Sequence, residues 1–218
     1  MLKITGITKS YNHREVIKGI SLEIGPNQIV GLLGPNGSGK TTCFNIIVGL
    51  VKQDKGEVVF NNKDIGNLPI YERSKIGIGY LPQEPSIFQN LSVENNILAI
   101  LELQNISKTQ KFESLESLMA DFKIEHLRKA KASSLSGGER RRLEIAKTLA
   151  MKPKIILLDE PFVGIDPIAI NEIKNILLDL KNSGISFLIT DHSVYQALQI
   201  IDVCYIICLL YTSDAADE

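Results

Sequence analysis

Short apolar runs alternate along the chain with segments in which apolar residues recur every three or four positions. Residues 3–7 and 16–24 come first, and the second run alternates apolar with polar residues, as an antiparallel strand with one solvated face does. Later runs are apolar almost throughout, which is typical of strands buried on both faces of a parallel sheet: 29–33, 76–81, 155–158 and 185–189. The pattern predicts an α/β fold.

Helical spacing appears in three segments between these strands. Apolar residues at 44, 47, 48 and 51 follow a glycine-rich turn. Asp166 and Pro167 predict a helix start, and Gly184 predicts the end of that helix. Between about 92 and 132 the pattern is helical throughout, and we expect this block to form a subdomain beside the sheet.

Composition narrows the class of protein. The 218 residues include 24 Lys+Arg and 25 Asp+Glu, a net charge of -1, so no global field attracts nucleic acid. Three cysteines are too few for a disulfide framework. We see no secretory signal and no apolar run of the roughly 20 residues that a membrane helix needs. We therefore expect one large cytosolic domain, with at most a small subdomain.

Residues 34–42 read Gly-Pro-Asn-Gly-Ser-Gly-Lys-Thr-Thr and lie between a strand and a helix. This run fits G-x-x-x-x-G-K-[ST], in which backbone N–H groups converge on phosphate. Lys40 would reach the outer phosphates, and the Thr41 hydroxyl would bind Mg²⁺. An ordinary glycine turn is the alternative, which the flanking strand and helix disfavour. The expected phosphate-binding residues are Gly34, Pro35, Asn36, Gly37, Ser38, Gly39, Lys40, Thr41 and Thr42.

A second candidate site follows the strand at 155–158, which ends in Asp159 and Glu160. Asp159 is suited to hold Mg²⁺, and Glu160 to take a proton from an attacking water. A solvated acidic turn after a strand is the alternative. The phosphate loop earlier in the chain favours the catalytic interpretation.

Residues 135–139, Leu-Ser-Gly-Gly-Glu, predict a second helix start that could bind an anion. Ser136 and Glu139 have the spacing of a capping box. Gly137 and Gly138 lower the helix propensity of the first turn, and their one advantage is that another group can approach the backbone closely there. We interpret the arginines at 140–142 as a solvated helix face, because glutamates interleave with them, and not as a nucleic-acid patch.

Together these motifs, with Gln83 and His192, resemble those of the ATP-binding-cassette (ABC) ATPases, for which Leu-Ser-Gly-Gly-Glu is highly specific. The resemblance covers residues 1 to about 207. It implies a P-loop NTPase fold with a RecA-like parallel-sheet core, an antiparallel β subdomain and a helical subdomain at about 88–135. It also implies ATP and Mg²⁺ as ligands.

The resemblance assigns roles to further residues. Tyr11 would stack on adenine, with a core aromatic at a strand end as the alternative. Gln83 would bind Mg²⁺ and sense the γ-phosphate, and His192 would contact that phosphate and position the water. Asp166 would cross the interface of a head-to-tail homodimer. The residues that would reach the partner's ATP are Ser136, Gly137 and Gly138.

Within the family, several segments are similar to ATPase subunits of lipopolysaccharide exporters: 77–84, 86–93, 124–127, 137–142 and 159–162. This similarity implies two transmembrane permease subunits docking near Gln83 and Phe88, and a peripheral place on the cytoplasmic face of the inner membrane. Only the partners would touch the lipid substrate, and no nucleic acid is involved. Phe88 could instead be a core residue of the helical subdomain.

Alternative functions remain. The chain could serve another ABC transporter, such as a branched-chain amino-acid importer, or act as a soluble ABC ATPase on DNA or ribosomes. An inactive interaction module is disfavoured because the catalytic residues are present.

Residues 208–218 depart from the family pattern and resemble translated sequencing-adapter DNA. We expect this tail to stay outside the fold and to leave the strand at 203–207 as an unpaired edge. Cys204 and Cys208 would share one strand face, without the further ligands that a metal site requires.

Overall fold

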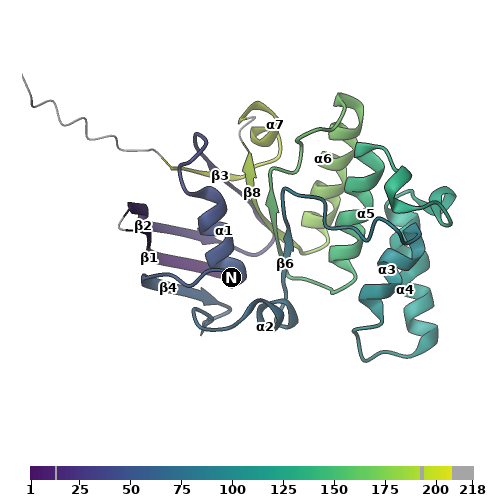
Figure 1. Cartoon of the computed structure of the whole chain (residues 1–218), viewed down its shortest axis with the longest axis horizontal. Coiled ribbons are helices and arrows are strands. Elements are labelled where there is room, and N and C mark those ends of the chain that lie inside the picture. The colour runs from purple at the N-terminus through teal and green to yellow at the C-terminus, as the bar shows by residue number, and fades with distance from the viewer. Residues whose placement is uncertain (13, 192–193, 208–218) are drawn as a thin grey trace, which may run out of the picture.

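The computed structural model describes residues 1–12, 14–191 and 194–207. Figure 1 shows their arrangement. The strands are β1 Leu2–Tyr11, β2 Arg14–Ile24, β3 Ile29–Leu33, β4 Lys55–Phe60, β5 Lys63–Asp64, β6 Ile78–Leu81, β7 Ile155–Asp159, β8 Ser186–Asp191 and β9 Val203–Ile206. The α-helices are α1 Lys40–Val48, α2 Ile70–Lys75, α3 Val93–Leu101, α4 Lys108–Asp121, α5 Gly137–Leu149, α6 Pro167–Asn182 and α7 Val194–Leu198; 3₁₀ turns span Glu125–Leu127 and Ala132–Ser134.

Five strands form the predicted parallel sheet, in the order β6-β7-β8-β3-β9. Every residue of β3, β7 and β8 is buried, as their nearly continuous apolar character predicts. β9 is an edge strand of the described sheet, and its Ile206 is 71% exposed. The carboxyl ends of these strands meet along one edge of the sheet, where the phosphate loop follows β3.

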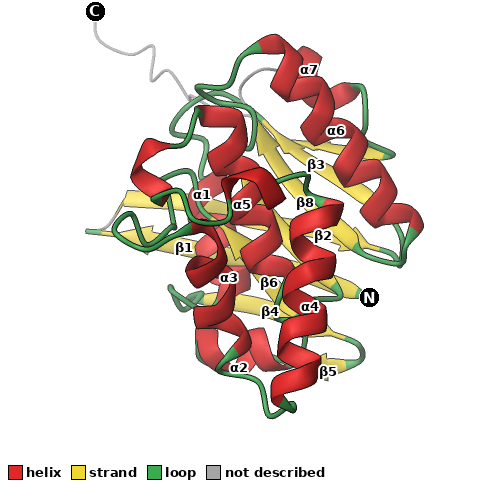
Figure 2. Cartoon of the chain, turned by 90° about the vertical axis from the view of Figure 1, so that its right-hand side faces the viewer, coloured by secondary structure: helices red, strands yellow, loops and turns green. Residues whose placement is uncertain are grey.

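The antiparallel sheet has the order β2-β1-β4-β5, and its β1–β2 pairing confirms the expected antiparallel strands. One core joins this sheet to α1 and to one face of the parallel sheet. A second core joins the opposite face to α3, α4, α5 and α6. The parallel sheet is therefore covered on both faces, with the helices of the second core gathered on one side (Figure 2).

The helical predictions need local corrections. α1 ends at Gly49, which has φ +86°, so Val51 lies beyond the helix instead of on its apolar face. The block at 92–132 is not helical throughout, because α3 and α4 are separate and Ser107 caps the second with a capping box. Phe112, an apolar member of that pattern, is 60% exposed. α6 begins after Asp166 and stops before Gly184, as predicted.

Two sequence predictions concern residues outside the described ranges. The first concerns His192, and the second concerns the tail at 208–218, which includes Cys208. Among the residues that the structure does describe, no helix is long and apolar enough to cross a membrane.

Candidate functional site

The loop between β3 and α1 is shaped by its glycines. Gly37 and Gly39 adopt φ +79° and +94°, and a Cβ on Gly39 would come within 2.9 Å of the Val16 carbonyl oxygen. The Lys40 ammonium is folded over the loop and donates to the carbonyls of Gly34 at 2.8 Å and Pro35 at 3.0 Å. Backbone N–H groups at the start of α1 complete a concave donor surface, the usual shape of a phosphate cradle.

Ser38 provides a test of whether this loop fits a phosphate group. Its side chain is 2% exposed, and its Oγ has no hydrogen-bond partner in the described structure. A buried hydroxyl without a partner is costly, and an oxygen-rich anion seated in the loop would accept its hydrogen bond. The loop therefore fits the phosphates of a nucleotide.

A cavity of about 470 Å³ brings the loop together with two residues from distant parts of the chain. Gln83 follows β6 and Glu160 follows β7, and these strands are neighbours in the sheet. The Gln83 Nε2 donates to Glu160 Oε2 at 2.8 Å, although 77 positions separate the residues. Three of the predicted motifs thus meet in one cavity.

Asp159 lies beneath this cavity and is 2% exposed. Burial raises the pKa of its carboxyl above the ordinary value, and the neighbouring Glu160 charge raises it further. Hydrogen bonds from the hydroxyls of Thr190 and Thr41, and the charge of Lys40, lower this pKa and so favour the carboxylate. A buried carboxylate of this kind is stabilised by a nearby cation.

The oxygen donors at this point fit Mg²⁺. Thr41, Gln83 and Asp159 offer a hydroxyl, an amide and a carboxylate oxygen, which are hard ligands. The described residues contain no cluster of three His, Cys, Asp or Glu side chains that could enclose a metal ion. Such a set suits an ion that keeps several ligands from nucleotide phosphates and water.

Glu160 has a constrained backbone. Its φ is +48°, a left-handed conformation that non-glycine residues rarely adopt. Its N–H donates to the Thr190 carbonyl at 3.0 Å. Strain of this kind persists where surrounding contacts fix a functional side chain, and here it presents the carboxylate to the cavity.

The solvated-face interpretation of the three arginines is wrong for Arg141, which is 6% exposed. Its guanidinium donates to the carbonyls of Pro161 at 3.0 Å and Glu160 at 3.1 Å, and it pairs with the buried Glu144 at 3.0 Å. Arg141 therefore fixes the backbone that carries Glu160. The one signal in the sequence was Glu144 at i+3 of Arg141, which allows an ion pair on one helix face; the contact with the Glu160 loop comes from the fold.

The residues at 136–138 lie apart from the nucleotide-sized cavity. Ser136 is exposed and forms the predicted capping box, with its hydroxyl accepting from Glu139 N–H at 3.4 Å. A Cβ on Gly137 would come within 2.9 Å of the Gly164 carbonyl oxygen, and one on Gly138 within 2.6 Å of the Ala169 Cβ. Packing against the start of α6 therefore requires both glycines.

Two further candidates also lie at the surface. Tyr11 is 44% exposed at the end of β1, with the Lys9 ammonium 5.5 Å from its ring centroid, so the core alternative for Tyr11 is wrong. Asp166 caps α6 by accepting from the N–H groups of Ile168 and Ala169 at 3.1 and 3.0 Å. Neither residue lines the described cavity.

Comparison with known proteins places this geometry in a family. The sequence model of the ABC transporter family matches residues 17–163. The lipopolysaccharide export system ATP-binding protein LptB of Haemophilus influenzae is 49% identical over 95% of this chain and 86% of its own length. The Escherichia coli K12 protein of the same name is 48% identical over 94% and 86%.

Solved structures agree. The ADP conformation of MJ1267, an ATP-binding cassette of an ABC transporter, superposes with a TM-score of 0.86 at 33% identity, over 95% of this chain and 87% of that one. A dimeric cassette, MJ0796 bound to ADP and Pi in a post-hydrolysis state, has a TM-score of 0.83 at 27% identity, over 95% and 94%. With its phosphate loop, Gln83 and Glu160 in one cavity, the chain belongs to the ABC transporter ATPases, which bind nucleotide and couple ATP hydrolysis to transport.

Proposed function

We propose that this chain is the ATPase subunit of a lipopolysaccharide exporter. The observation that carries the catalytic part is the Gln83–Glu160 hydrogen bond inside the cavity of the phosphate loop. The substrate is supported by similarity to proteins named for lipopolysaccharide export, which extends over nearly the whole chain. Residues 1–207 would form the nucleotide-binding domain, with a helical subdomain at about 88–135.

In the proposed reaction, the loop N–H groups, the Ser38 hydroxyl and Lys40 hold the phosphates of ATP, and Tyr11 stacks on adenine. Glu160 accepts a proton as a water oxygen bonds to the γ-phosphorus and the bond to the β-phosphate oxygen breaks, which yields ADP and phosphate. Mg²⁺, held by Thr41, Gln83 and Asp159, would neutralise phosphate charge. His192 is proposed to position the water.

The complete site is proposed to form between two copies of the chain. Ser136, Gly137 and Asp166 lie at the surface outside the cavity of their own chain, and with the adjoining buried Gly138 they would reach the partner's nucleotide. Exposed apolar side chains support an interface at this face: Val163, which lines the cavity, is 46% exposed, and Ile168 in the first turn of α6 is 76% exposed. The dimeric cassette with ADP and Pi supports the same assembly.

Permease subunits are proposed to dock beside Gln83 and Phe88. Asn96, fully buried, holds the Phe88 backbone by accepting from its N–H at 2.7 Å and donating to its carbonyl at 3.1 Å. The ring itself is 48% exposed, with the Lys147 ammonium 5.1 Å from its centroid, so Phe88 is not a core residue. An adjoining groove of about 220 Å³ contains Lys147 and apolar side chains, among them Ile70 and Met151.

These subunits would hold the chain at the cytoplasmic face of the inner membrane, as a peripheral protein. Lipid would be contacted by the transmembrane partners in transport, and nucleic acid is not a ligand. Copurification from the native membrane tests this assignment. Recovery of lipopolysaccharide with two permease subunits is expected, whereas recovery of amino-acid importer subunits would contradict it.

Glu160→Gln tests the catalytic proposal. The amide cannot take the proton, so turnover should fall about 10²–10⁴-fold while ATP binding is retained. Glu84→Gln is the matched control, because Glu84 is exposed, lies next to Gln83 and does not line the cavity. Turnover of Glu160→Gln within about twofold of the parent would refute the assignment of the base.

A further inference from the structure

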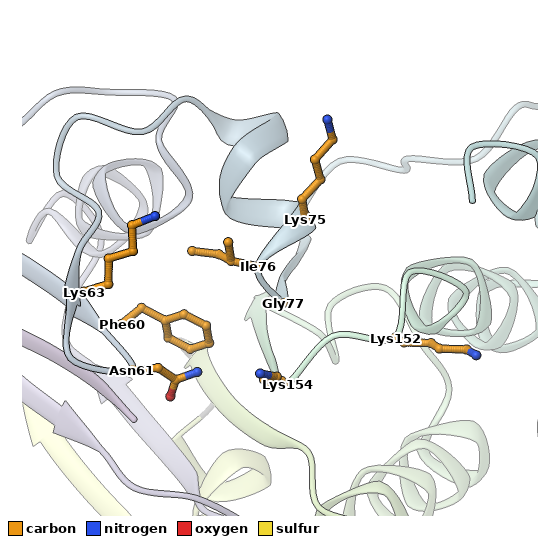
Figure 3. A pocket seen from close by; sticks show the side chains of 8 residues that line it. All are labelled: Phe60, Asn61, Lys63, Lys75, Ile76, Gly77, Lys152 and Lys154. Carbon is orange, nitrogen blue, oxygen red and sulfur yellow. The ribbon is translucent and has the colours of Figure 1, made fainter. Parts of the chain in front are cut away.

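Four lysines surround a cavity of about 390 Å³ (Figure 3), and none of its lining residues lines the nucleotide cavity. Lys63 comes from β5, Lys75 from the end of α2, and Lys152 and Lys154 from the segment before β7. Phe60 and Ile76 contribute apolar surface, and no carboxylate is among the lining residues. Three separate parts of the chain thus place positive charge around one depression.

Acidic neighbours of these lysines in the sequence, Glu72 three positions before Lys75 and Asp64 next to Lys63, form no salt bridge with them in the described structure. None of the four lysines takes part in the ion pairs found there. Asp64, next to Lys63, accepts instead from the Gly66 N–H at 2.8 Å. Because the whole chain carries a net charge of only -1, the cluster is a local feature. Four like charges repel one another, and an anionic partner would relieve that repulsion.

The directions of the lysine side chains favour an extended anionic surface over a single small anion as the ligand. In Figure 3, Lys75 and Lys152 extend away from the cavity, whereas Lys63 leans over it. Ammonium groups spread in this way do not converge on one small ion. They suit a surface that presents many phosphates, because flexible lysine side chains bind such surfaces as separate point charges.

The cavity adjoins the groove proposed for the permease. α2 separates them: Ile70 and Ser74 line the groove, and Lys75 lines the cavity. On the same helix Tyr71 is 59% exposed, with the Lys75 ammonium 5.7 Å from its ring centroid. Tyrosine and lysine side chains are typical of the membrane–water interface. If permease subunits fill the groove, as the proposed function requires, the lysines come close to the membrane surface.

We propose that Lys63, Lys75, Lys152 and Lys154 bind the phosphate headgroups of an anionic membrane surface beside the docked permease. The inference rests on the proposed function for the orientation of the chain. The lipid contact itself is a property of this face and needs neither nucleotide nor permease.

The test uses the full chain without nucleotide and sedimentation with vesicles of phosphatidylglycerol and phosphatidylcholine in equal parts at low salt. The cavity variant changes Lys63, Lys75, Lys152 and Lys154 to Gln. The matched control changes Lys18, Lys55, Lys108 and Lys123 to Gln, four exposed lysines that also lack ion pairs in the described structure. Both variants lose the same net charge, and thermal melting checks that both are folded.

Each lysine near an anionic surface contributes roughly fivefold to affinity, so the cavity variant should bind at least about twentyfold more weakly. The vesicle affinity of the control variant should stay within about threefold of the parent. Both variants should keep the parental rate of ATP turnover in solution. Lys63→Glu with Lys75→Glu makes the same change in net charge at only two positions and should weaken vesicle binding at least about twentyfold as well.

Equal losses of vesicle affinity in the cavity and control variants would overturn the proposal. Absence of vesicle binding by the parent chain would also overturn it. Pyrophosphate that binds the parent through these lysines, without vesicle binding, would assign the cavity to a soluble phosphate compound and also overturn it. The assay contains no permease and no ATP, so its failure is distinguishable from failure of the Glu160→Gln or copurification tests.

Discussion

Replacing Arg141 with methionine should destabilise the fold strongly and slow hydrolysis. Glu144 is 3% exposed and would lose its ionic partner, although its other oxygen still accepts from Ser86 N–H at 3.0 Å. Removing one member of a buried pair costs about 3–5 kcal/mol. For a chain of this size each kcal/mol lowers the melting temperature by about 2–4 °C, so we expect a fall of about 6–20 °C.

A double variant separates stability from catalysis. Arg141→Met with Glu144→Gln removes the stranded charge and keeps an acceptor for Ser86, so most of the lost stability should return. The carbonyls of Glu160 and Pro161 still lack the guanidinium donor, so the backbone that carries Glu160 is held less firmly than in the parent. We expect turnover to remain about 10–100-fold below the parent, because small misplacements of a catalytic group have effects of this size.

The assay is thermal melting together with steady-state ATPase activity at saturating Mg-ATP, per folded molecule. Arg142→Met is the control, because Arg142 pairs with the largely exposed Glu172 and such a pair contributes about 1 kcal/mol or less. A double variant that regains both melting temperature and turnover would refute the positioning role of Arg141.

Three further predictions follow from single contacts. Phe88→Ala should weaken permease association while sparing nucleotide affinity and melting temperature, because the ring is exposed; a large fall in melting temperature with retained pull-down would contradict this. Lys174→Met should lower kcat about tenfold at an unchanged KM, because the buried Lys174 ammonium ties Gln196 of α7 and Gln199, just beyond that helix, to the Phe162 ring, whose centroid is 5.6 Å away. Lys174→Arg should recover part of the rate, and equal rates for the two variants would contradict this role. Burial raises the pKa of Asp159, so the folded state holds the proton of this carboxyl more tightly than the unfolded chain does. The nucleotide-free protein should therefore lose stability as pH rises from the ordinary carboxyl pKa through the raised one. Asp159→Asn should remove both this loss and the stabilisation by Mg-ATP, as measured by thermal melting at a series of pH values.

The sequence predicts the parallel sheet well because β3, β7 and β8 are buried on both faces and read as apolar runs. Asp166 and Gly184 likewise predict the start and the end of α6, because capping and helix termination depend on local backbone chemistry. The phosphate loop is equally local, since its function depends on consecutive residues. What a short segment determines by itself can be predicted from that segment.

Arg141 and Phe88 show what a segment cannot determine. The three consecutive arginines are identical in type, yet only the fold shows that Arg141 meets the carbonyls of the Glu160 loop. Phe88 has ordinary core character, and its exposure follows from the buried Asn96 that holds its backbone. Both outcomes depend on specific polar contacts, from Arg141 to a loop 19 and 20 positions away and from Asn96 to the Phe88 backbone, and hydrophobic periodicity carries no information about such contacts.

If the nucleotide site is built from two chains, mixing two inactive variants should restore activity. Lys40→Ala removes the phosphate contact, and Ser136→Arg blocks the partner's nucleotide, so each homodimer should be inactive. In a mixed dimer of head-to-tail geometry both defects fall in one site and the other is intact. With free exchange about half of the dimers are mixed, which gives about a quarter of parental activity if the sites act independently.

Tandem fusions that carry both defects in one half make the measurement decisive. If the site is built from two chains, both sites of such a fusion are inactive, because its one defective half supplies the altered Lys40 position to one site and the altered Ser136 position to the other. A nucleotide site shared by two chains therefore predicts that the fusion is inactive and that the mixture of single variants recovers activity. A fusion that keeps about half the activity of a fully parental fusion would contradict it.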